Sequence, residues 1–390
     1  MLSRPVYVVL LAVLLLPFAG LLVQAEERPA SQQASESNDY DESVLLSRVR
    51  QLTFEGNRAG EGYFSPDGTQ MVFQSERVEG NPYFQIYVMD MLTGETRRIS
   101  PGQGKTTCAF FHPVTGDIEF ASTHHDPRSL DLQREELEFR ASGQEHRNAW
   151  DYDPEMEIYV ADAETGELTR LTNVWGYDAE GSYSPDGEWI VFGSTRDAYG
   201  RELTPEEQQA LETDPSYFSE IYTMRADGSE QTRLTHVPGY DGGPFYSPDG
   251  KKIVWRRFDE SGLLADVWTM DPDGSNQQQI TDFGAMSWAP YTHPSGEYIF
   301  FSSNKYGFAN FEVFIVDFEG KKEPVRVTTT NGFDGLPVPT PDGKQLVWTS
   351  TRYGATARQT GQLFVAGWNH EKALELLEQA PPRKSPSESH

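Results

Sequence analysis

An aromatic residue followed by aspartate recurs at three places in this 390-residue sequence. Each Asp stands six residues before the first residue of a Ser-Pro-Asp-Gly or Thr-Pro-Asp-Gly turn. Rings and carboxylates placed together can bind a cation, a basic protein segment or a sugar. The structural alternative is that each Asp closes its own loop by an Asx-type hydrogen bond while each ring packs between repeats. The pairs are Tyr177 with Asp178, Tyr240 with Asp241, and Phe333 with Asp334.

Two glutamates occupy a neighbouring position in the same repeat. Glu61 and Glu180 each stand four residues before the Ser of such a turn. Residues that serve the scaffold of every repeat are expected to recur in every repeat, and this position varies. The variation favours a binding role for the two glutamates. The other copies carry Cys108, Gly243, Ala289 and Leu336.

A histidine pair begins the longest insertion between repeats. His124 and His125 are followed by Asp126, and side chains of these types can join a metal site. No regular ligand spacing such as His-x3-His accompanies them, so metal binding and a structural role both stay open. Trp150 returns from the same insertion, and Trp288 lies between two later repeats. We expect these tryptophans at the rim of a binding site or in the packing between repeats.

A repeated turn must position all these residues. The motif occurs at residues 64–68, 183–187, 246–250 and 340–343, with looser copies at 112–116 and 293–296. Pro fixes the first corner of the turn, Asp caps the backbone, and Gly accepts a positive φ. An apolar or alternating run follows each copy, as at 189–192 and 253–255. Each turn is therefore predicted to join two strands.

An aromatic strand, a second turn and a short polar strand follow each such pair. Residues 85–90 with 97–100, and 157–162 with 168–172, are examples. The sixth repeat has a third strand at 362–365 and no fourth, while the first strand of the chain, 48–53, matches the missing one. We predict an all-β, six-bladed β-propeller of four-stranded antiparallel blades, closed by the N-terminal strand that completes the last blade.

Such blades place their connections on two faces. The tight turns, which join first to second and third to fourth strands, form what we call the turn face. The segments between blades and the second-to-third loops, with insertions at 124–154 and 197–219, form the link face. The second insertion contains a predicted N-capped helix starting at 204–207. The candidate residues named above are expected on the link face, around the mouth of the central channel, which we call the funnel.

The repeats resemble the WD-like propeller repeats of the TolB family over residues 49–368. The resemblance rests on the Ser-Pro-Asp-Gly turn, third strands of the type Ile-Tyr-Val-Met-Asp, and fourth strands that end in Leu-Thr. It implies a periplasmic, non-enzymatic propeller that docks other proteins. TolB itself carries an α/β domain ahead of its propeller, whereas only a short stretch occupies that place here. The resemblance therefore points to a stand-alone relative.

The N-terminal residues predict export. Arg4 is followed by an apolar run at 6–23 and by Val-Gln-Ala at 23–25, the pattern of a cleaved secretory signal, with a retained membrane anchor as the alternative. We expect a periplasmic or secreted protein with no membrane insertion after cleavage. Cys108 is the only cysteine, so no internal disulfide is expected. The predicted segments are a signal peptide at 1–25, a flexible acidic leader at 26–47, the propeller at 48–368, and a short helix with a disordered tail at 369–390.

The charge balance narrows the class of partner. With 60 acidic and 32 basic residues, the chain repels nucleic acid and anionic lipid. An envelope protein or peptide with a basic patch is the expected partner, and a monomer suffices to bind it.

Two enzyme classes share this type of propeller. Prolyl-oligopeptidase-like peptidases add a hydrolase domain with a nucleophile elbow, and no Gly-x-Ser-x-Gly occurs in this sequence. Lyases that act on acidic sugars cluster His around a divalent metal, and this sequence has only eight histidines. We interpret the protein as a non-enzymatic binding scaffold that requires no cofactor. The alternatives are a metal-dependent lyase or hydrolase acting on carbohydrate, and a structural subunit stabilised by a divalent cation such as calcium.

Overall fold

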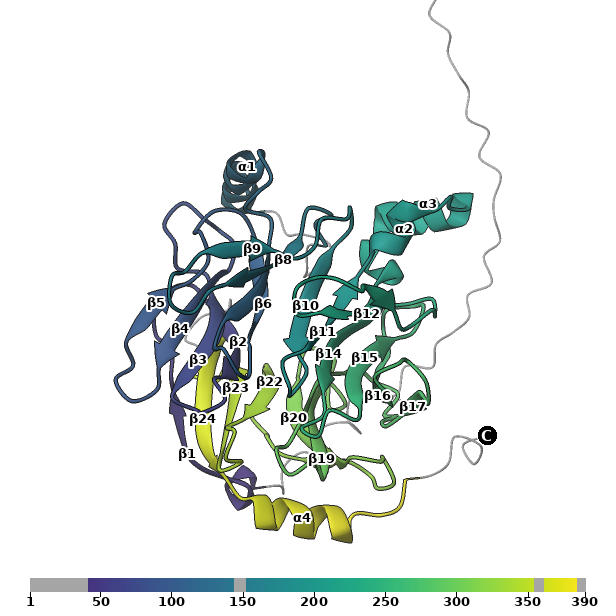
Figure 1. The fold of residues 1–390 in the computed structure, drawn as a ribbon. Coiled ribbons are helices and arrows are strands. Elements are labelled where there is room, and N and C mark those ends of the chain that lie inside the picture. The colour runs from purple at the N-terminus through teal and green to yellow at the C-terminus, as the bar shows by residue number, and fades with distance from the viewer. Residues whose placement is uncertain (1–40, 144–151, 354–360, 384–390) are drawn as a thin grey trace, which may run out of the picture. The chain divides into compact units, whose positions relative to one another are not determined.

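The computed structural model describes residues 41–143, 152–353 and 361–383. Over these residues the chain forms six four-stranded antiparallel sheets, arranged as the blades of a propeller (Figure 1). Figure 1 looks along the propeller axis, with the inner strands around the centre. The predicted fold class is confirmed.

Blades 1 to 5 each use four strands in chain order, from an inner strand at the channel to an outer strand at the rim. These strands are β2 (Ala59–Phe64), β3 (Gln70–Ser75), β4 (Gln85–Asp90) and β5 (Thr96–Arg98); β6 (Thr106–Phe111), β7 (Ile118–Ser122), β8 (Glu157–Ala161) and β9 (Leu168–Arg170); β10 (Asp178–Tyr183), β11 (Trp189–Ser194), β12 (Glu220–Arg225) and β13 (Thr232–Arg233); β14 (Asp241–Tyr246), β15 (Ile253–Phe258), β16 (Ala265–Met270) and β17 (Gln278–Gln279); and β18 (Ser287–Thr292), β19 (Tyr298–Ser303), β20 (Glu312–Asp317) and β21 (Val325–Arg326).

Blade 6 joins the two ends of the propeller. It contains β22 (Asp334–Pro339), β23 (Gln345–Ser350) and β24 (Gln362–Trp368), and its outer strand is β1 (Leu46–Gln51). Leu46 lies opposite Trp368, and Gln51 lies opposite Phe364. The predicted closure by the N-terminal strand is therefore present, and it leaves no unpaired edge where the ring meets.

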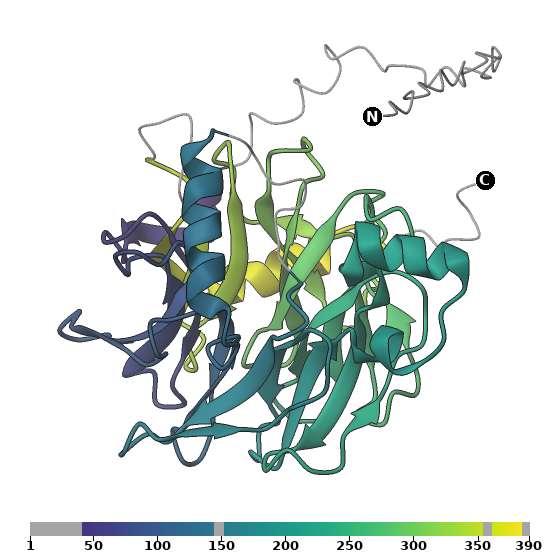
Figure 2. The ribbon, with the colours of Figure 1, turned by 90° about the horizontal axis from the view of Figure 1, so that it is seen from above.

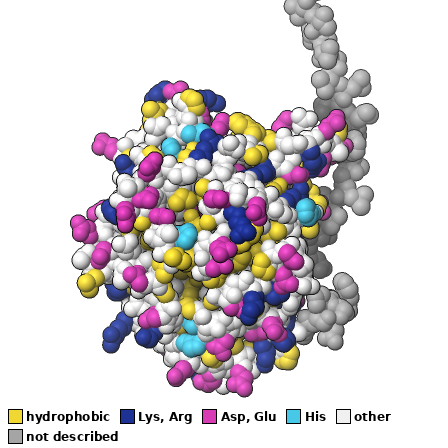
Figure 3. All heavy atoms as spheres, in the orientation of Figure 1, with side chains coloured by type: hydrophobic (Ala, Val, Ile, Leu, Met, Phe, Trp, Pro, Cys, Tyr) yellow, Lys and Arg dark blue, Asp and Glu magenta, His cyan; other side chains and the backbone are white. Residues whose placement is uncertain are grey.

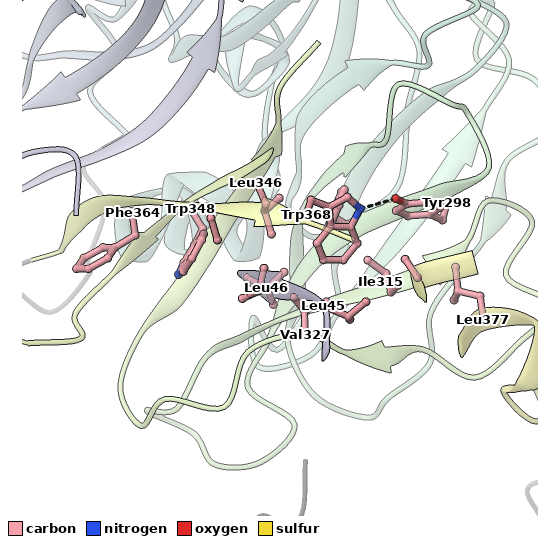
Figure 4. Packing of buried hydrophobic residues seen from close by; sticks show 14 residues of the cluster. Leu45, Leu46, Tyr298, Ile315, Val327, Leu346, Trp348, Phe364, Trp368 and Leu377 are labelled. Carbon is pink, nitrogen blue, oxygen red and sulfur yellow. Dashed lines mark hydrogen bonds between the residues drawn. The ribbon is translucent and has the colours of Figure 1, made fainter. Parts of the chain in front are cut away.

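The propeller begins before residue 48. A short 3-10 helix, η1 (Glu42–Val44), precedes β1, and Leu45 and Leu46 are only 1% and 2% exposed. Both leucines pack with residues of blades 5 and 6 in the largest buried cluster, shown in Figure 4. The end of the stretch expected to be a flexible leader is thus part of the core, because burying two leucines stabilises an ordered conformation.

The helices lie outside the blades. On the link face are α1 (Ser129–Ala141) in the first insertion, and α2 (Arg196–Gly200), α3 (Pro205–Thr213) and the 3-10 helix η2 (Pro215–Phe218) in the second. Helix α3 begins with a capping box between Thr204 and Glu207, as its sequence predicts. Figure 2 shows α1 and α3 in the upper half of the view. No helix in the described part of the chain is long and apolar enough to span a bilayer.

The central channel is closed toward the turn face. Each inner strand contributes the residue two positions before its turn, and we call this set the plug. Tyr63 contacts the rings of Phe110 and Phe245 at centroid distances of 5.3 and 5.4 Å, and Phe245 contacts Tyr291 at 5.0 Å. Figure 3 shows hydrophobic side chains along the middle of this face. The plug consists of Tyr63, Phe110, Ser182, Phe245, Tyr291 and Val338.

The repeated turns pack on one another around the plug. Gly187 lies against His112 of the preceding blade, and Gly343 lies against His293 in the same way. A Cβ at Gly187 or Gly343 would approach the imidazole within 2.5 or 2.8 Å. Both glycines also have a positive φ. The two histidines that replace Ser in the repeat therefore fill space between neighbouring turns.

A buried carboxyl group lies between blades 2 and 3. Glu119 on β7 is 1% exposed, and neither of its carboxylate oxygens has a hydrogen-bond partner among the described residues. It lies against Gly181 of β10, where a Cβ would come within 2.3 Å of the carboxylate. Burial raises the pKa of Glu119 well above its ordinary value. The folded protein therefore keeps this proton to a higher pH than the unfolded chain does.

Replacing the Glu119 carboxyl tests how much its burial lowers the free energy of unfolding. Because its pKa is raised in the folded state, Glu119 supports folding below its unfolded pKa and weakens it as pH rises. We expect Glu119→Gln to be favoured over wild type increasingly above about pH 5, by about 1 kcal/mol for each pH unit until the native carboxyl ionises. Urea unfolding across pH measures this. Exposed Glu95 in the β4–β5 turn supplies the control, Glu95→Gln, and a pH-independent effect of Glu119→Gln would contradict the prediction.

Candidate functional site

The position that carries Glu61 and Glu180 is a backbone bulge in every inner strand. The register of each inner strand shifts here against its neighbour. All six residues adopt a left-handed conformation, with φ of 53° at Glu61 and 60° at Glu180. Five of the six are not glycine, so the surrounding structure must impose this conformation. A bulge turns its residue out of the regular ladder, so the six bulge residues lie at equivalent positions around the funnel.

The bulge leaves backbone N–H groups that need acceptors from elsewhere. Several are bonded by a side chain from the preceding blade. Glu61 N donates to Thr349 Oγ1 at 3.1 Å, and Leu336 N donates to Ser302 Oγ at 3.1 Å. Cys108 N lies 3.4 Å from Gln74 Oε1. The inner ring of the propeller is therefore fastened blade to blade by side-chain acceptors.

Glu180 supplies the acceptor for blade 4. The second strand of blade 3 has Gly193 close to the Glu180 carboxylate and so offers no side chain of its own. Instead, Glu180 Oε2 accepts from Gly243 N at 2.6 Å. Its Oε1 accepts from Tyr240 Oη at 2.5 Å and from Arg256 Nη2 at 2.8 Å. Glu180 thus joins blade 3 to blade 4, and both its oxygens are engaged.

Glu61 has neutral donors. Its carboxylate accepts from Gln74 Nε2 at 2.8 Å, from Tyr63 Oη at 3.2 Å and from the thiol of Cys108. No cation lies within salt-bridge distance of it in the described part of the chain. Burial raises the pKa of Glu61, and the negative charge of Glu180 adds to this effect, although Arg256 and the hydrogen bonds oppose it. Burial also raises the pKa of Cys108 well above its ordinary value, so the thiol stays protonated.

Arg256 is the residue of the funnel that the sequence analysis missed. It forms an ion pair with Glu180 and its guanidinium lies over the rings of Tyr240 and Trp288, 4.9 and 5.8 Å from their centroids. It also hydrogen-bonds to Tyr240 Oη. The sequence holds a signal for it, because Arg256 and Arg257 are adjacent at the end of a second strand where other repeats have uncharged residues. The funnel thus contains two carboxyl groups and one guanidinium.

The three repeated aspartates are buried in ion pairs. Asp178 pairs with Arg196, Asp241 with Arg257 at 2.6 Å, and Asp334 with Arg352 at 2.8 Å. Each Asp is at most 1% exposed. Burial raises the pKa of each Asp, and the Arg partner opposes the rise. These carboxylates face arginines of their own blades, so they hold each inner strand to its neighbour and offer no free group to a ligand.

The aromatic residues of the same segments divide between packing and rim. Tyr177 is buried and contacts Tyr152, with ring centroids 5.0 Å apart. Tyr240 is buried and stacks on Phe258. Phe333 and Trp288 are half-buried, contact each other, and both touch Phe311. The indole Nε1 of Trp288 has no hydrogen-bond partner among the described residues. Trp288 and Phe333 are therefore the two rings best placed for a ligand.

The histidine pair lies beside the outer part of blade 2. The ring of His124 contacts that of Tyr159 on β8 with a centroid distance of 4.4 Å, and His124 Nδ1 lies 2.9 Å from Ser122 Oγ, while His125 Nε2 faces Glu155 at 3.2 Å. Burial lowers the pKa of His124. Within residues 41–143, 152–353 and 361–383, no group of three His, Cys, Asp or Glu side chains is arranged to hold a metal ion. The structure thus gives His124 and His125 local partners, and Trp150 lies outside the described residues.

Exposed apolar side chains gather on the link face. Among the described residues, 14 large hydrophobic side chains are exposed, and 11 of them lie in link-face segments distributed around the ring. Two others, Leu92 and Val114, lie on the turn face, and Val44 lies in η1. The link-face set, which we call the apolar rim, is Phe54, Leu130, Leu137, Val174, Trp175, Val237, Leu263, Leu264, Tyr306, Phe308 and Tyr353.

Comparison of the sequence with known proteins finds similarity over only part of the chain. No protein-family model matches this sequence. An uncharacterized protein of Agrobacterium fabrum is 40% identical over 107 residues, which are 27% of this chain and 30% of that protein. The match spans less than two thirds of the relative, so it does not assign a family.

Comparison by structure identifies the fold. A putative TolB from Agrobacterium tumefaciens is 20% identical, with 80% of this chain and 90% of that one covered and a TM-score of 0.53. TolB from Acinetobacter baumannii is 16% identical, with 84% of this chain and 65% of that one covered and a TM-score of 0.51. A gluconolactonase from Xanthomonas campestris is 11% identical, with 84% of this chain and 92% of that one covered and a TM-score of 0.52. Likeness at such identities concerns the fold alone. This chain is a six-bladed β-propeller of the TolB-like fold.

Proposed function

We propose that this protein is a non-enzymatic propeller that binds a protein partner on its link face. The observation that carries the proposal is the apolar rim, because 11 of the 14 exposed large hydrophobic side chains occupy one face. Single exposed apolar residues are ordinary, whereas their concentration on one face is typical of an interaction surface. Aromatic members such as Trp175 and Phe308 are of the type that contributes most to binding energy.

The charges favour a partner with a basic segment. The chain carries 60 acidic and 32 basic residues, so long-range attraction selects a positively charged surface. Helix α3, on the same face, has Glu206 and Glu207 in its first turn. In the funnel, Glu180 already has Arg256 as its partner, while Glu61 has only neutral donors. A Lys or Arg side chain of the partner that enters the funnel and reaches Glu61 would supply the missing cation.

The same proposal places the protein in the cell envelope. The apolar run at 6–23 with Val-Gln-Ala at 23–25 supports export, and the TolB-like fold agrees with a periplasmic or secreted binding protein. The alternative of a metal-dependent enzyme acting on carbohydrate has the gluconolactonase likeness in its favour, which concerns the fold alone. Among the candidate residues that the sequence singles out, Glu61, Trp288 and Phe333 are the proposed contacts, and Glu180 joins blade 3 to blade 4 beside them.

The apolar rim can be tested by capture from envelope extract. We expect Trp175→Ala/Phe308→Ala to abolish capture of the partner that wild type binds, because truncating aromatic anchors costs about 2 kcal/mol or more each. The matched control is Leu92→Ala/Val114→Ala, which removes two exposed apolar side chains from the turn face. Captured proteins are quantified by mass spectrometry at equal folded concentration. Loss of capture with the turn-face variant, but not with the rim variant, would reverse the assignment of faces.

The funnel can be tested by the pH dependence of binding to the captured partner. A cation pairs with the ionised form of Glu61, and the raised pKa of Glu61 means that binding must displace a proton at lower pH. We expect affinity to rise about tenfold between about pH 5 and pH 8 in wild type, and to lose this dependence in Glu61→Gln. Titration on an immobilised partner measures this, with Glu95→Gln as the turn-face control. A Glu61→Gln variant that keeps the full dependence would exclude Glu61 as a contact.

A further inference from the structure

Helix α4 (His370–Gln379) lies along the outer edge of blades 5 and 6 (Figure 1). Its apolar side is buried at Ala373 and Leu377, which join the cluster of Figure 4. At its C-terminal end, Lys322 Nζ donates to the carbonyl oxygens of Glu378 and Ala380. These contacts hold the apolar side and the C-terminal end of the helix, whereas its first residue, His370, is held by ring stacking.

The first residue of α4 stacks on a turn of blade 5. The imidazole of His370 lies parallel to that of His293, with a centroid distance of 4.5 Å and an interplanar angle of 5°. Tyr298 stacks on both rings, with centroid distances of 4.6 Å to His293 and 5.7 Å to His370. His293 is 4% exposed and stands where three other blades have the Ser of the turn. The N-terminal end of α4 thus contacts blade 5 through two adjacent imidazole rings.

The hydrogen bonds around the pair engage Nδ1 of both rings. Trp368 Nε1 donates to Tyr298 Oη at 2.7 Å (Figure 4), and Tyr298 Oη lies 3.0 Å from His370 Nδ1. His293 Nδ1 accepts from Ser295 N at 3.1 Å, so the proton of the neutral His293 ring is on Nε2. A second proton on His293 would remove the acceptor that Ser295 N uses.

Positive charge on His293 and His370 would be repelled within the pair and by the helix dipole. Two imidazolium rings 4.5 Å apart repel each other, and a positive charge on His370 lies at the N-terminal end of the α4 dipole. Glu297 faces His370 Nε2 at 3.6 Å and is the nearest opposite charge. Asp342, Lys344 and Glu371 line a pocket of about 560 Å³ that reaches both histidines, so solvent protons have access to the pair.

We propose that His293 and His370 form a pH-sensitive latch, which holds α4 against blades 5 and 6 at neutral pH and releases its N-terminal end in mild acid. Burial, and then the charge of His370, lower the pKa of His293 to about 4. When α4 leaves, the ring of His293 regains an ordinary pKa near 6.5 and takes up a proton. Docking is therefore fully favoured above about pH 6.5 and weakens as the pH falls toward 4. Release would expose the apolar seam around Trp368 and Leu45.

Hydrogen–deuterium exchange of the full chain tests the latch, independently of any link-face partner. We expect protection over residues 370–380, corrected for intrinsic rates, to fall about tenfold or more between about pH 7.5 and pH 5. Protection of β11 should stay constant over this range, which separates release of α4 from unfolding. An unchanged protection of residues 370–380 in wild type would overturn the proposal.

Two histidine substitutions at the same place in the repeat make a matched pair. His293→Ser restores the residue that other blades use, and it should make the protection of α4 independent of pH. His112→Ser makes the same change in blade 2, whose turn has no contact with α4, and should keep the wild-type response. His370→Gln gives a second test that leaves the turn intact. A pH-dependent loss of protection that persists in both His293→Ser and His370→Gln would overturn the proposal.

Discussion

The pairing of β1 with β24 is the constraint on which the rest of the molecule depends. It joins residues more than 300 positions apart and turns a row of blades into a ring. The seam is sealed by Leu45 and Leu46, which pack with Trp368 and other residues of blades 5 and 6. Ring closure also brings Thr349 of blade 6 to the backbone of Glu61 in blade 1. The geometry of the funnel therefore follows from a contact at the outer edge of the propeller.

Inside the ring, the same side chains serve the scaffold and shape the funnel. The bulge in each inner strand frees a backbone N–H, and the acceptor comes from whichever neighbouring side chain can reach it. Where the preceding blade has Gly193, Glu180 takes this role, which brings Arg256 and Tyr240 with it. Variation at the bulge position thus reflects differences between neighbouring blades. Glu61 is the exception, since among the described residues no cation pairs with its carboxylate.

The sequence predicts the strands and turns of the repeat and their closure into a ring. The six turns, the closing strand, the two faces and the cap of α3 all follow from local turn and strand chemistry, which each repeat carries in full. The side-chain network of the funnel could not be predicted in this way. Glu180 hydrogen-bonds to Gly243 and Arg256, which are 63 and 76 residues away. These contacts depend on a left-handed backbone at Glu180, which its residue type does not predict. The ordered segment at Leu45 and Leu46 was also missed, because two leucines beside a polar stretch gain their partners only when the ring closes.

The turn face, the link face and the outer edge of the propeller have different physical properties, and these suit different tasks. On the turn face, Gly187 packs against His112 and Gly343 against His293, and the plug lies beneath these turns. This close packing leaves the turn face little room to rearrange. The link face has the two insertions and the apolar rim, where side chains remain available to a partner. Helix α4 lies on the outer edge, where apolar contacts and the histidine pair hold it, and hydrogen bonds to residues 321–323 hold its C-terminal end. Because its attachment shares no residue with the funnel, α4 can loosen while the funnel keeps the geometry that blade-to-blade hydrogen bonds give it.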